Sequence, residues 1–273
     1  MNITNSNEIY NGDRGKLFQK MIIRLLKRAK IREENIDLLT NEYGMMMYGQ
    51  AFTAASADVD VNYEMFEQLG DVTANKFIVW YMYRRFPQLR HPLGVKVVAR
   101  LRINYGARQS FSEIGDRLGF WDFISASEED RGRKKKDLLE DCIESFIGVT
   151  EFLIDEAYRP GVGHAVVYDI LQNIFDEIHI SLRYEDLYDA KTRLKEVFDF
   201  HKESLGKLKY TNSRDVDSGL FTAHVYNGNN SIGYGVASKL KDAEQKAAVN
   251  GMKQITISGF SKPVPPEYKK FNN

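Results

Sequence analysis

The chain lacks the features of a secreted or membrane-spanning protein. It holds one cysteine in 273 residues, Cys142, so no intrachain disulfide can form. No run approaches the ~18 consecutive apolar residues that a membrane span needs. Residues 1–10 are polar and rich in asparagine, without the apolar stretch of a signal peptide. We therefore expect a cytoplasmic protein, or at least one in a reducing intracellular compartment, with no membrane partner.

Net charge is also absent, since 38 basic and 38 acidic side chains cancel. The charges are unevenly spread: 24 basic and 29 acidic residues precede Asp189, and 14 basic and 9 acidic residues lie from Asp189 onward. A more basic C-terminal part is typical of a phosphate-binding module, although an ordinary solvated domain also fits. The length suits two domains, and a hydrophobic content of 43% is enough for packed cores.

Two short segments carry acidic side chains at helical spacing. Residues 62–71 read NYEMFEQLGD, and residues 141–148 read DCIESFIG. Apolar neighbours surround both acidic sets, so the carboxylates would lose hydration and repel one another unless protons or cations neutralised them. Carboxylate oxygens suit hard ions such as Mg²⁺ or Mn²⁺. Helical spacing places the acidic side chains of each segment on one face: Glu64, Glu67 and Asp71 in the first, and Asp141 and Glu144 in the second.

Both segments resemble motifs of the ribonuclease III family. Residues 63–71 are similar to the signature NERLEFLGD, and residues 141–148 to the second acidic motif, DAFEALIG. Three further segments match that family in order and spacing: AFTAAS at 51–56, YMYRRFP at 81–87 and SFSEIGDRLGF at 110–120. The five matches cover most of residues 15–160. The chain is identified as a divergent member with one nuclease domain and one double-stranded-RNA-binding domain.

The resemblance implies a role for each acidic residue. Four carboxylates would bind two Mg²⁺ ions, with Mn²⁺ as a substitute. Of these, Asp71 and Glu144 would be catalytic: Glu144 would bridge the ions and Asp71 would help to position the attacking water. Glu64 would support the site. The four metal-binding residues are Glu67, Asp71, Asp141 and Glu144.

The resemblance also implies a homodimer formed through the nuclease domain. Two sites across the minor groove of one RNA duplex would leave 5′-phosphate ends and two-nucleotide 3′ overhangs. Phe66, Leu69 and Phe77 of the signature helix are expected to supply part of the subunit contact, and the alternative for each is that it only packs in the domain's own core.

The expected fold is an all-helical nuclease domain at 15–180, an α-β-β-β-α double-stranded-RNA-binding domain at 187–259, and a flexible tail at 260–273. Apolar periodicity in the first domain predicts helices at 16–30, 75–86, 93–105, 111–118 and 164–178, with a charged loop at 128–136. In the second, it predicts a helix at 184–200, strands at 207–214, 220–226 and 231–237, a hairpin turn at 227–230, and a helix at 239–257.

The second domain matches its family less well than the first. Residues 189–196 are similar to the opening D-x-K-T-x-L-Q-E, and residues 238–248 to the S-K-K-x-A-K-x-x-A-A of the last helix. However, Asp199 stands where a glutamine is usual, and Leu240 displaces a lysine. We hypothesise that this module binds duplex RNA weakly or docks mainly on protein. The resemblance implies RNA contacts from Thr192, Lys195, Glu196, Lys239, Lys241 and Lys246.

The sequence therefore predicts a Mg²⁺-dependent endoribonuclease that cleaves double-stranded RNA. An alternative is a non-cleaving protein that sequesters double-stranded RNA from silencing or sensing, and another is a structural subunit of a processing complex. All four expected metal ligands are present, which favours cleavage. Ala54, Met65 and Gln68 depart from the family pattern near the site. These departures and the asparagine-rich ends suggest an unusual lineage, such as a viral or a protist one.

Overall fold

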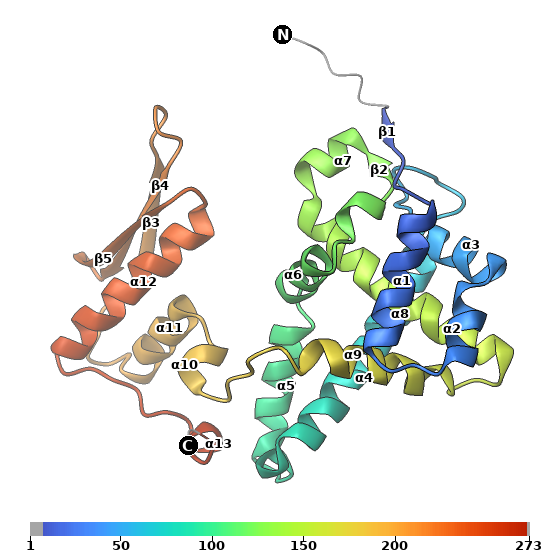
Figure 1. Ribbon diagram of the computed structural model, residues 1–273. Coiled ribbons are helices and arrows are strands. Elements are labelled where there is room, and N and C mark those ends of the chain that lie inside the picture. The colour runs from blue at the N-terminus through green and yellow to red at the C-terminus, as the bar shows by residue number, and fades with distance from the viewer. Residues whose placement is uncertain (1–7, 272–273) are drawn as a thin grey trace. The chain divides into compact units, whose positions relative to one another are not determined.

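The chain divides at Ile180 into two compact units in a computed structural model that describes residues 8–271 (Figure 1). Residues 1–7, which carry most of the polar N-terminal segment, and residues 272–273, which end the predicted tail, lie outside the described residues. Within 8–271, no helix is both long enough and apolar enough to cross a lipid bilayer.

The first unit is helical, as predicted, apart from one small antiparallel pair of strands, β1 (Ile9–Tyr10) and β2 (Ala126–Ser127). Two short 3₁₀ helices lie at Pro87–Leu89 and Trp121–Phe123. The α-helices are α1 (Lys16–Arg28), α2 (Glu33–Thr40), α3 (Glu42–Ala51), α4 (Glu64–Arg85), α5 (Gly94–Tyr105), α6 (Arg108–Leu118), α7 (Glu128–Arg133), α8 (Lys135–Ala157) and α9 (Gly163–Phe175).

Helices α4 and α8 form the centre of this unit and cross at two glycines. A methyl group built on Gly70 of α4 would collide with the carbonyl oxygen of Glu144, and one on Gly148 of α8 with the carbonyl oxygen of Phe66. The two backbones therefore touch with no side chain between them. Because α8 is buried along most of its length, from Leu138 to Ile154, it is held on several sides and fixes the crossing.

The charged stretch 128–136 was predicted as a loop, and that prediction is wrong. It forms α7 and the start of α8. Ser127 caps α7 by accepting the backbone N–H of Asp130 at 3.2 Å. Acidic residues fill the first turn of α7 and arginines the last, which suits the helix dipole. The guanidinium of Arg131 lies 3.8 Å from the ring centre of Tyr10 and 3.9 Å from that of Trp121.

The second unit has the predicted order of helix, three strands and helix. Its sheet is antiparallel with strand order β3-β4-β5. Helix α12 packs against β4 and β5, and α11 packs against α12. Leu194 and Phe198 of α11, Val225 of β4 and Ala247 of α12 meet in one core. The elements are α10 (Tyr184–Leu187), α11 (Ala190–Phe200), β3 (Leu208–Arg214), β4 (Phe221–Asn227), β5 (Asn230–Ala237), α12 (Leu240–Ile257) and α13 (Pro266–Lys269).

Two predictions in the second unit are wrong. The single helix at 184–200 is broken, because Asp189 leaves the helical conformation and caps α11 by accepting the backbone N–H of Thr192 at 2.9 Å. The tail predicted as flexible contains α13 instead. Tyr268 and Phe271 are buried there, and the ring of Tyr268 lies 5.4 Å from that of Tyr184.

We predict that Gly70→Ala destabilises the first unit by at least ~1–3 kcal/mol, because the added methyl group must push two backbones apart. Urea unfolding followed by far-ultraviolet circular dichroism measures the change. Gly132→Ala is the matched control: this glycine also lies in a helix, but nothing is within 4 Å of its added methyl group. It should be neutral or stabilising by up to ~1 kcal/mol. Equal effects of the two substitutions would contradict the close crossing.

Candidate active site

The crossing of α4 and α8 brings the predicted carboxylates near one another. Glu67 and Asp71 come from α4, on either side of Gly70, and Asp141 and Glu144 come from α8. Each carboxylate acts electrostatically on others across the crossing: Asp71 and Glu67 on Glu144, and Asp141 on Glu67. Glu64 lies at the exposed start of α4, where its charge also reaches Glu67. The five acidic residues predicted from the sequence therefore gather around one place.

Burial sets the electrostatics of this cluster. Glu144 is only 6% exposed. Loss of hydration, and then repulsion by Asp71, raise its pKa to about 8. The same two causes, with Asp141 as the main repelling charge, raise the pKa of Glu67 to about 7. Near neutral pH the cluster therefore gains stability from any cation or proton that neutralises it.

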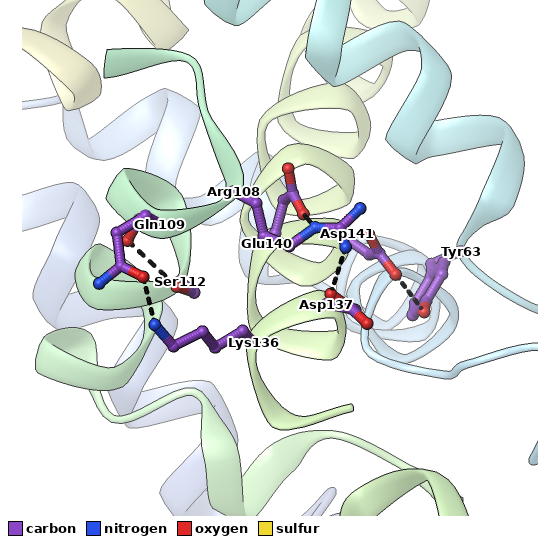
Figure 2. Close-up of polar contacts among 8 residues, drawn as sticks. All are labelled: Tyr63, Arg108, Gln109, Ser112, Lys136, Asp137, Glu140 and Asp141. Atoms are coloured by element: carbon purple, nitrogen blue, oxygen red, sulfur yellow. Dashed lines mark hydrogen bonds and ion pairs between the residues drawn. The ribbon is translucent and has the colours of Figure 1, made fainter. Parts of the chain in front are cut away.

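Tyr63 holds the carboxylate of Asp141 in place. The Tyr63 hydroxyl donates a hydrogen bond of 2.8 Å to Oδ2 of Asp141 (Figure 2). Burial raises the pKa of Asp141, and this hydrogen bond opposes the shift. The pKa of the Tyr63 hydroxyl itself is raised by burial and by Asp141, so it remains a donor at physiological pH. The carboxylate of Asp141 is thus oriented as a hydrogen-bond acceptor.

Arg108 of α6 neutralises the outer side of the cluster. It lies between two acidic residues of α8 in Figure 2. Its Nε is 2.5 Å from Oε2 of Glu140, and its Nη1 is 2.6 Å from Oδ1 of Asp137. Burial raises the pKa of Glu140, and the arginine lowers it. The sequence analysis missed Glu140, although it lies one helical turn before Glu144 on the same face of α8.

Asp71 is also held by a neighbour that the sequence analysis did not single out. The side-chain amide of Asn75, one turn later on α4, donates to Oδ1 of Asp71 at 2.7 Å. The i, i+4 spacing of the two residues was a usable signal. Nothing local in the sequence indicated Arg108, which reaches α8 from α6. Tyr63 opens the first acidic segment, but no pattern linked its hydroxyl to Asp141.

These carboxylates supply the ligand chemistry that hard divalent cations prefer. As the side chains lie, however, no group of three or more His, Cys, Asp or Glu residues within 8–271 is arranged so that it could hold a metal ion. Like charges that share a site without a cation keep apart. The residues therefore fit a cation by donor type, burial and proximity, and closing them around one needs side-chain movement.

The residues predicted to bind RNA divide into two groups in the second unit. Lys195, Lys239 and Lys241 have exposed side chains. The other three make contacts within the unit. Thr192 donates its hydroxyl and its backbone N–H to Asp189, at 2.9 Å each. Glu196 pairs with Lys262 at 2.7 Å, and Lys246, although it is exposed as well, donates to a backbone carbonyl of β5 at 2.9 Å. The exposed lysines are the best placed of the six for phosphate.

A groove of about 890 Å³ lies beside two of these lysines, between α11, the start of β3 and the start of α12. Its rim is mixed in charge: Lys191 pairs with Glu244 at 2.5 Å, and Asp199 also lines it. The acidic residues reduce the attraction for phosphate on this side, in line with the departures seen in the sequence.

Family models match a segment of each unit. The Ribonuclease III domain model matches residues 64–151, and the Double-stranded RNA binding motif matches residues 190–255. A protein assigned as a ribonuclease 3 in Invertebrate iridescent virus 6 is 41% identical over 96% of each chain. A relative assigned in the same way in Frog virus 3 is 45% identical over 59% of this chain, which covers 44% of that relative.

Bacterial proteins are more distant. The Ribonuclease 3 of Lactococcus lactis subsp. cremoris is 27% identical over 79% of this chain and 94% of its own length. Among solved structures, the nuclease domain of ribonuclease III from Campylobacter jejuni is 23% identical, with a TM-score of 0.43, over 55% of this chain and all of that domain.

The raised pKa values of Glu67 and Glu144 predict how stability depends on pH. The folded chain keeps protons that the unfolded chain releases at the usual glutamate pKa of about 4.3. The stability that these groups contribute is complete below that pH and is lost as pH rises through about 7 and about 8. In EDTA, the melting temperature relative to Glu144→Gln should therefore fall across this range.

Mg²⁺ should restore the loss, with a larger rise in melting temperature at the alkaline end, where the carboxylates are ionised. Differential scanning fluorimetry of the wild type and Glu144→Gln, with EDTA and with Mg²⁺, measures both effects. A melting difference between the two proteins that is constant with pH would contradict the proton linkage.

Proposed function

The chain belongs to the ribonuclease III family of endoribonucleases that act on double-stranded RNA, and from that premise we propose that it hydrolyses the duplex with two divalent cations bound by Glu67, Asp71, Asp141 and Glu144. Mg²⁺ is the proposed ion, with Mn²⁺ as a substitute. The observation that carries the proposal is Glu144, a buried carboxylate facing three others where α4 and α8 cross. A buried carboxylate surrounded by like charges needs a positive partner to offset its lost hydration, and a bound cation would supply that partner.

The chain's own residues would prepare the site in three ways. Tyr63 fixes the orientation of Asp141 through a hydrogen bond of 2.8 Å, and Asn75 does the same for Asp71 at 2.7 Å. Arg108 offsets the charge of Glu140, so that repulsion within the cluster is reduced. Glu144 would bridge the two cations, and Asp71 would position the attacking water. When bound, the cations would supply Lewis-acid stabilisation of the leaving alkoxide and a more acidic water.

We propose further that the active form is a homodimer assembled through α4, and that its paired cuts leave 5′-phosphates and two-nucleotide 3′ overhangs. Two expected contact residues, Phe66 and Phe77, are buried within the unit and cannot serve, but Leu69 is exposed. It belongs to a row with the heptad spacing of a helix–helix seam. The exposed apolar residues of that row are Met65, Leu69, Val72, Val79 and Tyr83.

The second domain would hold the duplex through phosphate contacts, with the exposed Lys195, Lys239 and Lys241 as the main contributors and Thr192, Glu196 and Lys246 at the edges. We keep the domain limits 15–180 and 187–259, and a cytoplasmic location, as predictions. Asp199 and Glu244 in the neighbouring groove support weak binding by this module, so the nuclease domain would contribute much of the affinity.

The proposal predicts that Glu144→Gln lowers the cleavage rate at least ~100-fold, because even residues that only support a metal ligand typically contribute 10–100-fold. The assay follows a labelled RNA duplex of about 30 base pairs, roughly twice the span of one binding domain. Glu156→Gln is the matched control, since Glu156 also lies on α8 but is exposed and accepts a hydrogen bond from Tyr43 at 3.1 Å. Tight binding without cleavage in Mg²⁺ and in Mn²⁺ would instead support the sequestering alternative.

The dimer proposal predicts that Val72→Glu weakens self-association by ~30-fold or more, the effect of losing about 2 kcal/mol at an interface centre. Sedimentation velocity over a range of concentrations gives the dissociation constant. Leu17→Glu is the control, because Leu17 on α1 is 63% exposed, close to the 68% of Val72, but lies off the row. A monomeric wild type, or equal effects of the two substitutions, would overturn this interface.

A further inference from the structure

Within residues 8–271, one face of the sheet in the second unit is not covered by any helix of that unit. Ala223 and Val225 of β4 are buried on the side of α12. On β5, a methyl group built on Gly233 or Gly235 would collide with the backbone of α12, so these glycines also face that helix. Because side chains alternate along a strand, the residues between them point to the opposite face. That face is the open side of the sheet.

Three aromatic rings lie together on this open face. The strand register pairs His224 of β4 with Tyr234 of β5, and Tyr226 is two residues along β4. The ring centres are 6.0 Å apart for His224 and Tyr234, and 6.3 Å apart for His224 and Tyr226. Tyr234 is 60% exposed. We call these three residues the ring platform.

The backbone under the platform is fixed by α12. The side-chain amide of Asn250 donates to the carbonyl oxygen of Tyr234 at 2.8 Å, and Lys246 donates to that of Val236 at 2.9 Å. The edge strand β5 is thereby tied to the helix behind it. The rings are therefore presented by a rigid support, which reduces the entropy lost when a ligand stacks on them.

The charge and polarity of the sheet favour a polyanion. Strands β3, β4 and β5 contain no aspartate or glutamate, and Lys209 is a basic residue on the open face. Lys209 stands opposite Tyr226 in the register, at the edge of the platform. The other open-face positions are mostly hydroxyl-bearing: Thr211, Ser213, Thr222 and Ser231. Rings for stacking, hydroxyls for base edges and a lysine for phosphate are the groups that hold unpaired nucleotides on protein surfaces.

We propose that the ring platform binds an unpaired stretch of RNA, such as a single-stranded tail beside a duplex. Paired bases are stacked inside their own helix and cannot stack on these rings, so the platform distinguishes unpaired RNA from blunt duplex. This goes beyond double-strand cleavage and does not depend on it. It gives the second domain two RNA surfaces, lysines near the helix ends for duplex phosphate and the open sheet face for unpaired bases.

The test uses the full chain in EDTA, so that binding is read without cleavage. Fluorescence anisotropy measures the affinity for a labelled oligouridylate of about 12 nucleotides, and in parallel for a blunt duplex. Tyr234→Ala should weaken oligouridylate binding by about 5- to 100-fold, the effect of one stacked base, and leave duplex binding unchanged. Tyr234→Phe, which keeps the ring, and Val236→Ala, which removes a ringless neighbour on the same face, should resemble the wild type.

A second measurement does not rely on substitution. An oligonucleotide carrying 4-thiouridine, photocrosslinked to the wild type and mapped by mass spectrometry, should attach at Tyr226 or Tyr234. The proposal is overturned if Tyr234→Ala binds oligouridylate as the wild type does, if it loses both RNAs equally, or if crosslinks fall on α11 and α12 alone. It is also overturned if Tyr234→Ala changes the oligomeric mass instead, because the face would then be a protein contact.

Discussion

Two helix backbones touch where Gly70 faces the carbonyl of Glu144 and Gly148 faces the carbonyl of Phe66. No larger residue fits at either position, so the distance between α4 and α8 is set by main chain alone. Because the main chain is stiffer than side chains, this contact also fixes the positions from which the carboxylates on either side of it extend. The positions of Glu67, Asp71, Asp141 and Glu144, and the repulsion among them, depend on this contact.

The same contact explains why the site is electrostatically strained. Helices that pack this closely exclude water from the side chains at their crossing, and Glu144 is buried as a result. The pKa of Glu144 is raised because a charge at this position is destabilised by lost hydration and by repulsion. A bound cation would remove the repulsion and replace the lost solvation, so the same carboxylates would favour cation binding. The hydrogen bonds from Tyr63 and Asn75 limit how far two of the carboxylates can turn away.

Much of this could be predicted from the sequence, because the motifs are local. The helical spacing of the acidic residues, the order of elements in the second domain and the strand boundaries there all follow from short-range pattern. Most of what failed depends on contacts between distant residues; the helix break at Asp189 is the exception, because its cap is local. The charged stretch 128–136 folds as a helix with Arg131 between Tyr10 and Trp121, and Tyr268 holds the tail against Tyr184. Arg108 reaches the site in the same way, from α6, and no pattern linked the hydroxyl of Tyr63, at the start of the first acidic segment, to Asp141.

The central claim is that this crossing builds a site for two divalent cations. Crystals of the wild type grown with Mn²⁺ and measured at the manganese absorption edge test it most directly. The account predicts two anomalous peaks about 4 Å apart, bounded by Glu67, Asp71, Asp141 and Glu144, with Glu144 between them. Manganese bound only elsewhere on the chain, or no peak at the crossing at saturating Mn²⁺, would contradict it.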